Sequence, residues 1–303
     1  MLVNDELRKC VVFFGIRDAD GKFLPRATGF AVSCVEHGYR FLHLVTAEHV
    51  VSGLLSRGHE IWVRMNGAGG GLVNEGPIER QYWSFHPDSE RSPTDVAVIP
   101  FNPRPNLNIK AIEIVGPDPM AGTAEIIAEQ KIGPGEEIAV IGLFRSHHGI
   151  DKAIPVVRVG HISVMREEPV HTKYCGYIDA YLVEVMSIGG LSGSPVFVSM
   201  PPMRIVDLKV QMTDAKQFYL LGLMHGHFDI RNLNEDAVSD GEQDALGSIN
   251  TGLGVVVPVE KIIETMMQPG LSEMRRKTAE KTRKAEGATT DQASDDRPAS
   301  DAN

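Results

Sequence analysis

Short runs rich in Val, Ile, Phe and Tyr follow one another along most of this 303-residue sequence, and most of them end at Gly, Pro, Asn or Asp. Helical periodicity is scarce, with one short turn expected at Ala47 and one amphipathic stretch at 259–267 that Pro269 and Gly270 should end. Many short strands with little helix predict an all-β sandwich or barrels and exclude βαβ units. The runs are residues 10–16, 28–34, 39–45, 61–65, 96–101, 137–143, 155–165, 177–185, 196–198, 218–224 and 252–257.

These runs are more numerous than the strands of a single small barrel, so two barrels of similar size are the simplest division. A weak boundary falls at 116–122, where the sequence reads GPDPMAG. We therefore expect an N-terminal β-barrel in residues 1–118, a C-terminal β-barrel with a closing helix in 119–270, and a charged tail in 271–303. The tail has no aromatic residue and carries seven basic and seven acidic side chains. We expect a solvated helix at 274–286 and disorder from Gly287 onward, and the tail is a candidate binding segment for a protein partner.

The charge balance excludes a protein built to coat phosphate backbones. Lys and Arg number 30 against 40 Asp and Glu, which gives a formal net charge of −10. No apolar run approaches the roughly 18–20 residues that span a bilayer. The three cysteines, Cys10, Cys34 and Cys175, are too few for a disulfide scaffold and are expected to be reduced thiols, and the N-terminus lacks a secretory signal. We expect a cytoplasmic protein with neither a nucleic-acid nor a membrane partner.

Three separated segments carry complementary chemistry. Thr46-Ala47-Glu48-His49-Val50 follows an apolar strand, and Thr94-Asp95-Val96-Ala97-Val98 opens another. The third segment is Gly189-Gly190-Leu191-Ser192-Gly193-Ser194-Pro195-Val196. A serine hydroxyl is too weak an acid to attack an amide unaided, so it needs an imidazole to take its proton and a carboxylate to orient that imidazole. Glycines beside the serine allow a tight turn whose amide hydrogens can converge on an oxyanion.

Together the segments resemble the chymotrypsin/trypsin-like serine peptidase family, and within it the bacterial HtrA-like branch without a PDZ domain. TGF at 28–30 with VTAEHVV at 45–51 is similar to that family's histidine motif, DVAVI at 95–99 to its aspartate motif, and GLSGSPVF at 190–197 to its nucleophile motif. The three key residues stand 46 and 97 positions apart in the family's order. LLGL at 220–223 and GLGVVVP at 252–258 resemble later strands, so the resemblance covers roughly residues 8–267.

The resemblance implies two six-stranded antiparallel barrels with a serine endopeptidase site in the cleft between them. It assigns His49 as general base, Asp95 as its orienting carboxylate and Ser192 as nucleophile, with the backbone amides of Gly190 and Ser192 as oxyanion hole. Neither a metal nor an organic cofactor is required for this chemistry. The substrate would be a protein or peptide.

Several positions depart from the family pattern. Leu191 replaces an aspartate that pairs with a new N-terminus in secreted enzymes, Ser194 replaces a glycine, and His225 stands where a serine usually lies near the catalytic aspartate. By family position, Met186 forms the floor of the specificity pocket, and His225, Gly226 and His227 form the strand beside it. Met186 with His227 predicts a small or apolar substrate side chain. The acidic segment 229–250 argues in the other direction, toward basic substrates.

Other interpretations remain beside the peptidase. A catalytically silent scaffold that binds peptides is the alternative, supported by Ser194 and His225. An α/β-hydrolase elbow fails because Ser194 breaks G-x-S-x-G and a strand follows where that fold needs a helix. Zinc ligation by His147 and His148, or by His225 and His227, lacks a third ligand at metal-like spacing. Asp229 is the nearest candidate for that third ligand. The glycine run at 67–71 has no Lys-Ser/Thr after it, so it predicts a flexible connection and not a phosphate loop.

Overall fold

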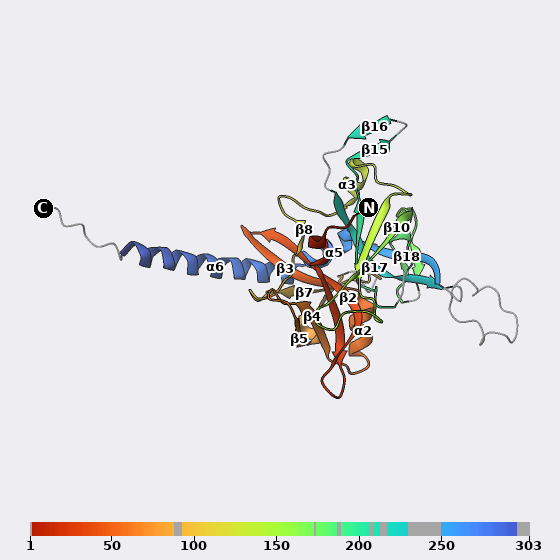
Figure 1. Cartoon of the computed structure of the whole chain (residues 1–303). Helices are drawn as coiled ribbons and strands as arrows, with labels where there is room; N and C mark the ends of the chain where they lie inside the picture. Colours follow the sequence, from red (N-terminus) through yellow and green to blue (C-terminus); the bar gives the residue numbers. More distant parts are fainter. Residues whose placement is uncertain are drawn as a thin grey trace.

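The computed structural model describes residues 2–87, 93–172, 174–186, 189–206, 209–212, 217–229 and 250–295. It is mostly β, with two large, mainly antiparallel sheet systems side by side and its longest helix at the C-terminal end (Figure 1). Cys10, Cys34 and Cys175 are free thiols, and the first two are buried. No helix in the described ranges combines the length and apolar composition that a membrane crossing requires.

The first system is an eight-stranded sheet in the order β5-β4-β1-β2-β3-β7-β6, with β8 pairing in parallel with β2. The expected closed six-stranded barrel is therefore wrong for this half. The long strand β2 pairs with three neighbours, and β6, at the far end of the path, has only two residues and pairs with β7 alone. The strands are β1 (Val11–Arg17), β2 (Phe23–Glu36), β3 (Tyr39–Thr46), β4 (Ile61–Asn66), β5 (Leu72–Ile78), β6 (Ser84–Phe85), β7 (Ala97–Phe101) and β8 (Ile112–Val115).

The second system is a closed six-stranded barrel in the order β10-β13-β18-β17-β14-β9, as the sequence predicts. Its strands are β9 (Glu137–Gly142), β10 (Val156–Val164), β13 (Tyr181–Glu184), β14 (Pro195–Ser199), β17 (Phe218–Asp229) and β18 (Asn250–Pro258). Two small hairpins stand outside it, β11 (Val170–Thr172) with β12 (Gly176–Ile178) and β15 (Met203–Val206) with β16 (Lys209–Met212).

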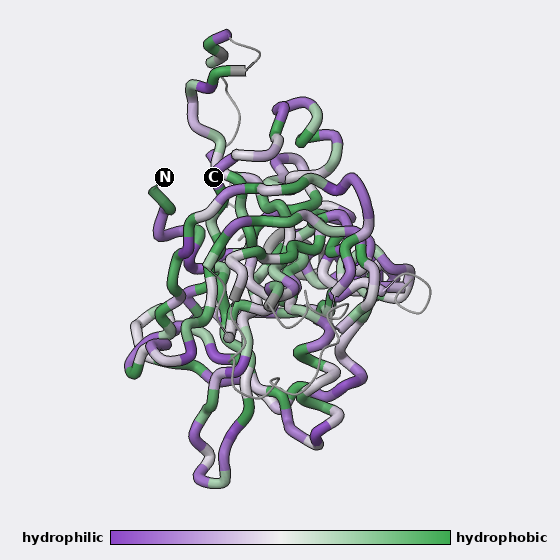
Figure 2. The backbone as a smooth tube through the Cα atoms, turned by 90° about the vertical axis from the view of Figure 1, so that its right-hand side faces the viewer, coloured by the Kyte–Doolittle hydropathy of each residue, from purple (hydrophilic) through white to green (hydrophobic). Residues whose placement is uncertain are grey.

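Each sheet system has its own apolar interior, and a third cluster joins the two. Phe14 and Leu44 lie in the first interior, and Val140 and Leu221 in the second. The joining cluster takes buried residues from both systems, among them Phe30, Val45, Ile141, Phe197 and Leu220. Hydrophobic positions accordingly concentrate where strands cross in the middle of the molecule (Figure 2). Burial of this shared cluster fixes how the two halves sit against each other.

The C-terminal region is helical as far as Asp295, so a helix is present at 274–286 as expected, and it continues past Gly287, where disorder was expected. Pro269 and Gly270 separate two helices but do not end helical structure, because proline is well tolerated in the first turn of a helix. Ala, Glu, Lys and Arg, which are good helix formers, dominate the chain after Gly270, and Arg276 pairs with Glu273 and Glu280 at helical spacing. The helices in the part of the chain that the structure describes are α1 (Asp5–Arg8), α2 (Glu48–Leu55), the 3₁₀ turn η1 (Arg80–Tyr82), α3 (Ala124–Glu129), α5 (Val259–Met266) and α6 (Pro269–Asp295).

A buried arginine holds the start of α6 against the body, while its far end projects away from the sheets (Figure 1). The Arg275 side chain is 1% exposed. Its Nε donates to Glu36 Oε2 at 2.5 Å, and its Nη1 donates to the Met266 carbonyl at 2.9 Å. Its Nη1 also lies 3.3 Å from His43 Nε2, and burial together with the Arg275 charge lowers the pKa of His43 to about 4. His43 is therefore neutral at pH 7 and accepts from Arg275.

Replacing Arg275 with methionine should destabilise the protein by about 3 kcal/mol, because Glu36 and the Met266 carbonyl lose their donor inside the fold. Urea unfolding followed by circular dichroism measures this change. Arg276→Met is the matched control one residue along the same helix, since Arg276 is on the solvent side, and it should leave the unfolding midpoint nearly unchanged. Equal midpoints for the two variants would contradict the anchoring role of Arg275.

Candidate active site

The Asp95 carboxylate is the hub of the site. It lies just before β7 and has no exposed surface. Oδ1 accepts from the His49 backbone N–H at 2.8 Å, and Oδ2 accepts from His49 Nδ1 at 2.7 Å. Ala47, the N-cap residue of α2, makes no side-chain capping bond, so Asp95 satisfies an amide in the first turn of that helix. One carboxylate therefore fixes both the backbone and the ring of His49.

A second imidazole shares this carboxylate. His225 Nδ1, on β17 of the barrel, lies 2.5 Å from Asp95 Oδ2, and His225 is buried. Burial alone would raise the pKa of the Asp95 carboxyl, but the charge of His49 and the hydrogen bonds from both rings hold that pKa well below its ordinary value. An ionised carboxylate only accepts, so both rings carry a proton on Nδ1. With Nδ1 bound to Asp95, Nε2 is the His49 nitrogen that can accept a proton from a serine when the ring is neutral.

The three groups lie close enough together to raise the question of a metal. One nitrogen or oxygen from each of His49, Asp95 and His225 lies within 4.8 Å of the others. The Nδ1 protons that bond to Asp95 account for the arrangement, and a metal would have to displace both of them. We therefore assign hydrogen bonding and not metal ligation to this cluster.

Ser192 lies in a turn of the barrel that is bound to the first sheet through one threonine. Thr28, on β2, donates from its backbone N–H to the Ser192 carbonyl at 3.1 Å. Its Oγ1 donates to the Gly190 carbonyl at 2.7 Å and accepts from the Leu143 N–H at 2.9 Å. Thr28 thus fixes the backbone on both sides of Leu191 from the opposite sheet system.

Gly193 shows why this turn needs glycine. Its φ is +80°, and a Cβ there would lie 2.3 Å from the Thr28 carbonyl oxygen and 2.4 Å from Thr46 Oγ1. Any larger residue would push the turn away from β2, and with it Ser192 from His49. Glycine at this position therefore permits the close approach of the two halves.

The three residues of the predicted triad come together at one cleft. Ser192 and His49 both line a cleft of about 720 Å³, and Asp95 lies behind His49 in the interior. Gly190, Gly226 and His227 line the same cleft, as the sequence predicts for the substrate strand and the oxyanion turn. In the described chain no hydrogen bond joins Ser192 Oγ to His49. Such bonds are often long before substrate binds.

Met186 does not line this cleft, which corrects its assignment to the pocket floor. Its side chain is 63% exposed. Met186 lies two residues beyond the end of β13, and the described residues that line the cleft do not include it. The acidic segment that bears on basic substrates lies outside the described residues, apart from Asp229 and Asn250 at its ends.

Tyr174 is a residue of the site that sequence reasoning missed. It lies in the connection between β11 and β12, and its ring stacks on that of His49 with centroids 4.8 Å apart and an interplanar angle of 8°. An aromatic face stacked on the ring limits rotation of His49. No motif marks this position in the sequence, because it reaches His49 only through the folded hairpin.

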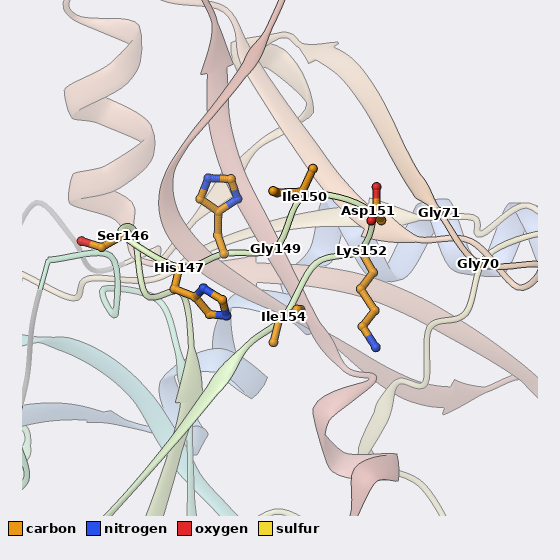
Figure 3. Close-up of a pocket in the computed structure, with 10 residues that line it drawn as sticks. Gly70, Gly71, Ser146, His147, Gly149, Ile150, Asp151, Lys152 and Ile154 are labelled. Carbon is orange, nitrogen blue, oxygen red and sulfur yellow. The ribbon is translucent and has the colours of Figure 1, made fainter.

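The glycine run at 67–71 forms the hairpin connection between β4 and β5, with φ of +86° at Gly70 and +79° at Gly71. Together with the loop at 146–154, it borders a second pocket of about 530 Å³ (Figure 3). His147, Asp151 and Lys152 lie along that loop, and His148 also lines the pocket. The pocket is separate from the cleft of His49 and Ser192, so neither the glycine run nor His147 and His148 belong to the candidate active site.

Ser194 offers a first test of the site's packing. Its backbone does not adopt positive φ, and its hydroxyl fits because Gly142 has no side chain: a Cβ there would lie 2.0 Å from Ser194 Oγ. That oxygen is buried without a hydrogen-bond partner among the described residues. Ser194→Ala should therefore raise the free energy of unfolding by about 1 kcal/mol.

Thr28→Val leaves the Gly190 carbonyl and the Leu143 amide without their hydrogen-bond partner, so it should lower the free energy of unfolding by about 2 kcal/mol.

Urea unfolding of both variants measures these two opposite shifts. A loss of stability in Ser194→Ala would mean that the hydroxyl has a partner after all.

Glu48 provides a second test, based on pH. Burial and the nearby Asp95 charge raise the pKa of the Glu48 carboxyl to about 7 from an ordinary 4.5. Between these values the folded protein holds a proton that the unfolded chain has lost, so stability falls as pH rises from 4.5 to 7. Glu48→Gln should remove this loss, and its stability should exceed that of the parent increasingly across that range. Urea midpoints at pH 5, 6, 7 and 8 test this, and parallel curves would contradict it. The exposed Glu129→Gln controls for the loss of a surface charge.

Comparison with known proteins finds solved structures that resemble this chain at low sequence identity. No protein-family model matches the chain, and no curated protein matches it. Among solved structures, Deg5 matches with a TM-score of 0.46 and 14% identity, over 86% of this chain and 88% of that one. Inactive Rv3671c from Mycobacterium tuberculosis H37Rv matches as a Ser343Ala mutant with a TM-score of 0.42 and 17% identity, over 87% of each chain. A second inactive form, described as the Rv3671c protease, gives 0.41 and 16%, over 87% and 90%. Likenesses at this level do not by themselves indicate an activity.

Proposed function

We propose that this chain is a serine endopeptidase that acts through Ser192, His49 and Asp95. The observation that carries the proposal is the 2.7 Å contact between His49 Nδ1 and a buried Asp95 carboxylate, on the same cleft as Ser192. The contact places the His49 proton on Nδ1, so Nε2 can act as the base. Order along the chain, glycine-rich turn and cleft also agree with the family resemblance found in the sequence.

The reaction follows from these groups. His49 Nε2 takes the Ser192 hydroxyl proton as Oγ attacks the peptide carbonyl, and the imidazolium that forms is stabilised by Asp95. The amides of Gly190 and Ser192 would donate to the oxyanion, in a turn that Thr28 holds in place. His49 then gives its proton to the leaving amine. A water molecule next attacks the acyl-serine as it gives a proton to His49, and His49 returns that proton to Ser192 Oγ as the acyl bond breaks. Tyr174 contributes by keeping the ring in its plane.

The substrate would lie as an extended strand beside β17. β14 pairs with β17 only as far as Leu223, while β17 continues to Asp229 and lines the cleft at His225, Gly226 and His227. Backbone pairing of a peptide with this stretch would bring its carbonyl past Ser192.

A second function, peptide binding without hydrolysis, has specific observations in its favour. His225 shares Asp95 Oδ2 with His49, which divides the carboxylate between two rings. No hydrogen bond joins His49 to Ser192 within the described chain. A silent scaffold would keep the cleft and its contacts and lack an activated Ser192.

Labelling with a fluorophosphonate probe separates the two functions, because only an activated serine reacts with it. We expect the parent to be labelled, Ser192→Ala to be unlabelled, and Asp95→Asn to react about a thousandfold more slowly because its His49 tautomer is lost. Ser146→Ala, an exposed serine outside the cleft, should react like the parent. Absence of labelling in the folded parent would reject the peptidase and favour the scaffold.

A further inference from the structure

The cleft of Ser192 and His49 is lined by cations. Three arginines, Arg26, Arg57 and Arg145, lie on its walls together with His59 and His227. None of the described residues that line the cleft is Asp or Glu. Asp95 is fully buried behind His49. The cleft thus presents positive charge in a protein whose formal net charge is −10.

These three arginines also differ from most others in the molecule. Each is exposed, and within the described ranges none forms an ion pair. Elsewhere arginines are bound to carboxylates of the protein itself: Arg8, Arg40, Arg104, Arg166, Arg204, Arg275 and Arg276. Guanidinium groups that gather at a concave surface without protein partners are available to an anionic ligand, and such a surface concentrates that ligand.

Arg145 has the position closest to the expected chemistry. It lies on the loop after β9, and its side chain covers the turn before Ser192. A Cβ on Gly190 would lie 3.0 Å from Arg145 Cγ, and one on Gly189 would lie 3.4 Å from Nη1. A substrate carbonyl that meets the Gly190 amide therefore brings its neighbouring side chains within reach of the Arg145 guanidinium.

The other two arginines belong to the opposite wall. Arg26 is on β2, and Arg57 follows the C-terminal end of α2, the helix that carries His49 in its first turn. Cations from both sheet systems thus border the path of a peptide through the cleft. A peptide with an acidic residue beside the scissile bond and another farther along could engage both walls.

We propose that the cleft selects acidic peptide segments, with Arg145 binding a carboxylate next to the scissile bond and Arg26 and Arg57 binding acidic residues farther away. This inference rests on the proposed peptidase function for its cleavage step, but its binding step does not depend on hydrolysis. It replaces the prediction of a small or apolar preference, since Met186 is outside the cleft. Arginine forms paired hydrogen bonds with a carboxylate, so the selection should be for charge as well as shape.

The first experiment compares cleavage of two quenched fluorescent peptides that differ only by Glu against Gln at the positions flanking the scissile bond. We expect kcat/KM to be about tenfold to a hundredfold higher for the Glu peptide, and the ratio to fall as salt is added. Arg145→Gln should reduce the ratio toward one. Arg104→Gln is the matched control, because Arg104 is exposed, pairs with Glu75 and is outside the cleft, and it should keep the parent's ratio.

The second experiment measures binding to Ser192→Ala by fluorescence anisotropy, with the same two peptides, a matching Lys peptide and a single-stranded oligonucleotide. Tighter binding of the Glu peptide supports the inference even if the parent is never labelled by fluorophosphonate, which separates it from the proposed function. Equal binding of the Glu and Gln peptides, preference for the Lys peptide, or tightest binding of the oligonucleotide would overturn the inference.

A third protein tests whether the acidic segment contributes to the preference. It carries the amides in place of Glu235, Asp236, Asp240, Glu242 and Asp244 and is assayed in parallel. Loss of the Glu preference in this variant would also overturn the assignment to the arginines.

Discussion

A carboxylate with no exposed surface stands between the two halves of this molecule, and the candidate site is arranged around it. Burying an isolated charge costs several kcal/mol, so the fold is compatible with an ionised Asp95 only because three donors face it. Two of these donors come from His49, at the start of α2, and the third from His225 on the barrel. The same interactions that offset the burial cost of Asp95 fix the tautomer of His49 and hold β17 against the end of the first sheet.

The second joint between the halves is Thr28. Three of its hydrogen bonds reach the barrel half of the molecule, at the Ser192 carbonyl, the Gly190 carbonyl and the Leu143 amide. Asp95 and Thr28, both in the first sheet system, thus form hydrogen bonds with residues of the barrel half. The arrangement also explains why small residues matter there, since the approach of β2 leaves no room for a side chain at Gly193. The geometry of the site is therefore a property of the boundary and of the shared apolar cluster beneath it.

The strands and the three motifs could be predicted because alternation, turn residues and motif spacing are local properties of the chain. Closure of the first sheet could not, because it depends on whether the end strands β5 and β6 meet, and no residue pattern states that. A helix was expected at 274–286, but the anchor of α6 could not be predicted, because Arg275 binds Glu36 at a separation of 239 residues. Tyr174 and Arg145 reach the site through hairpins and loops whose course depends on the whole fold. Met186 was misplaced because family position does not give the course of the chain after β13, where this side chain is exposed.

No hydrogen bond joins Ser192 to His49 in the described chain, but the segments that carry the two residues are held in place by other contacts. Thr28 binds the Ser192 carbonyl, its own carbonyl accepts from Thr46 Oγ1, and Asp95 holds the His49 amide, so the backbones on both sides of the gap are tied together. The His49 ring is fixed further by its bond to Asp95 and by the stacked Tyr174. The backbone of the Ser192 turn and the orientation of the His49 ring are therefore both set by contacts across the boundary between the two sheet systems.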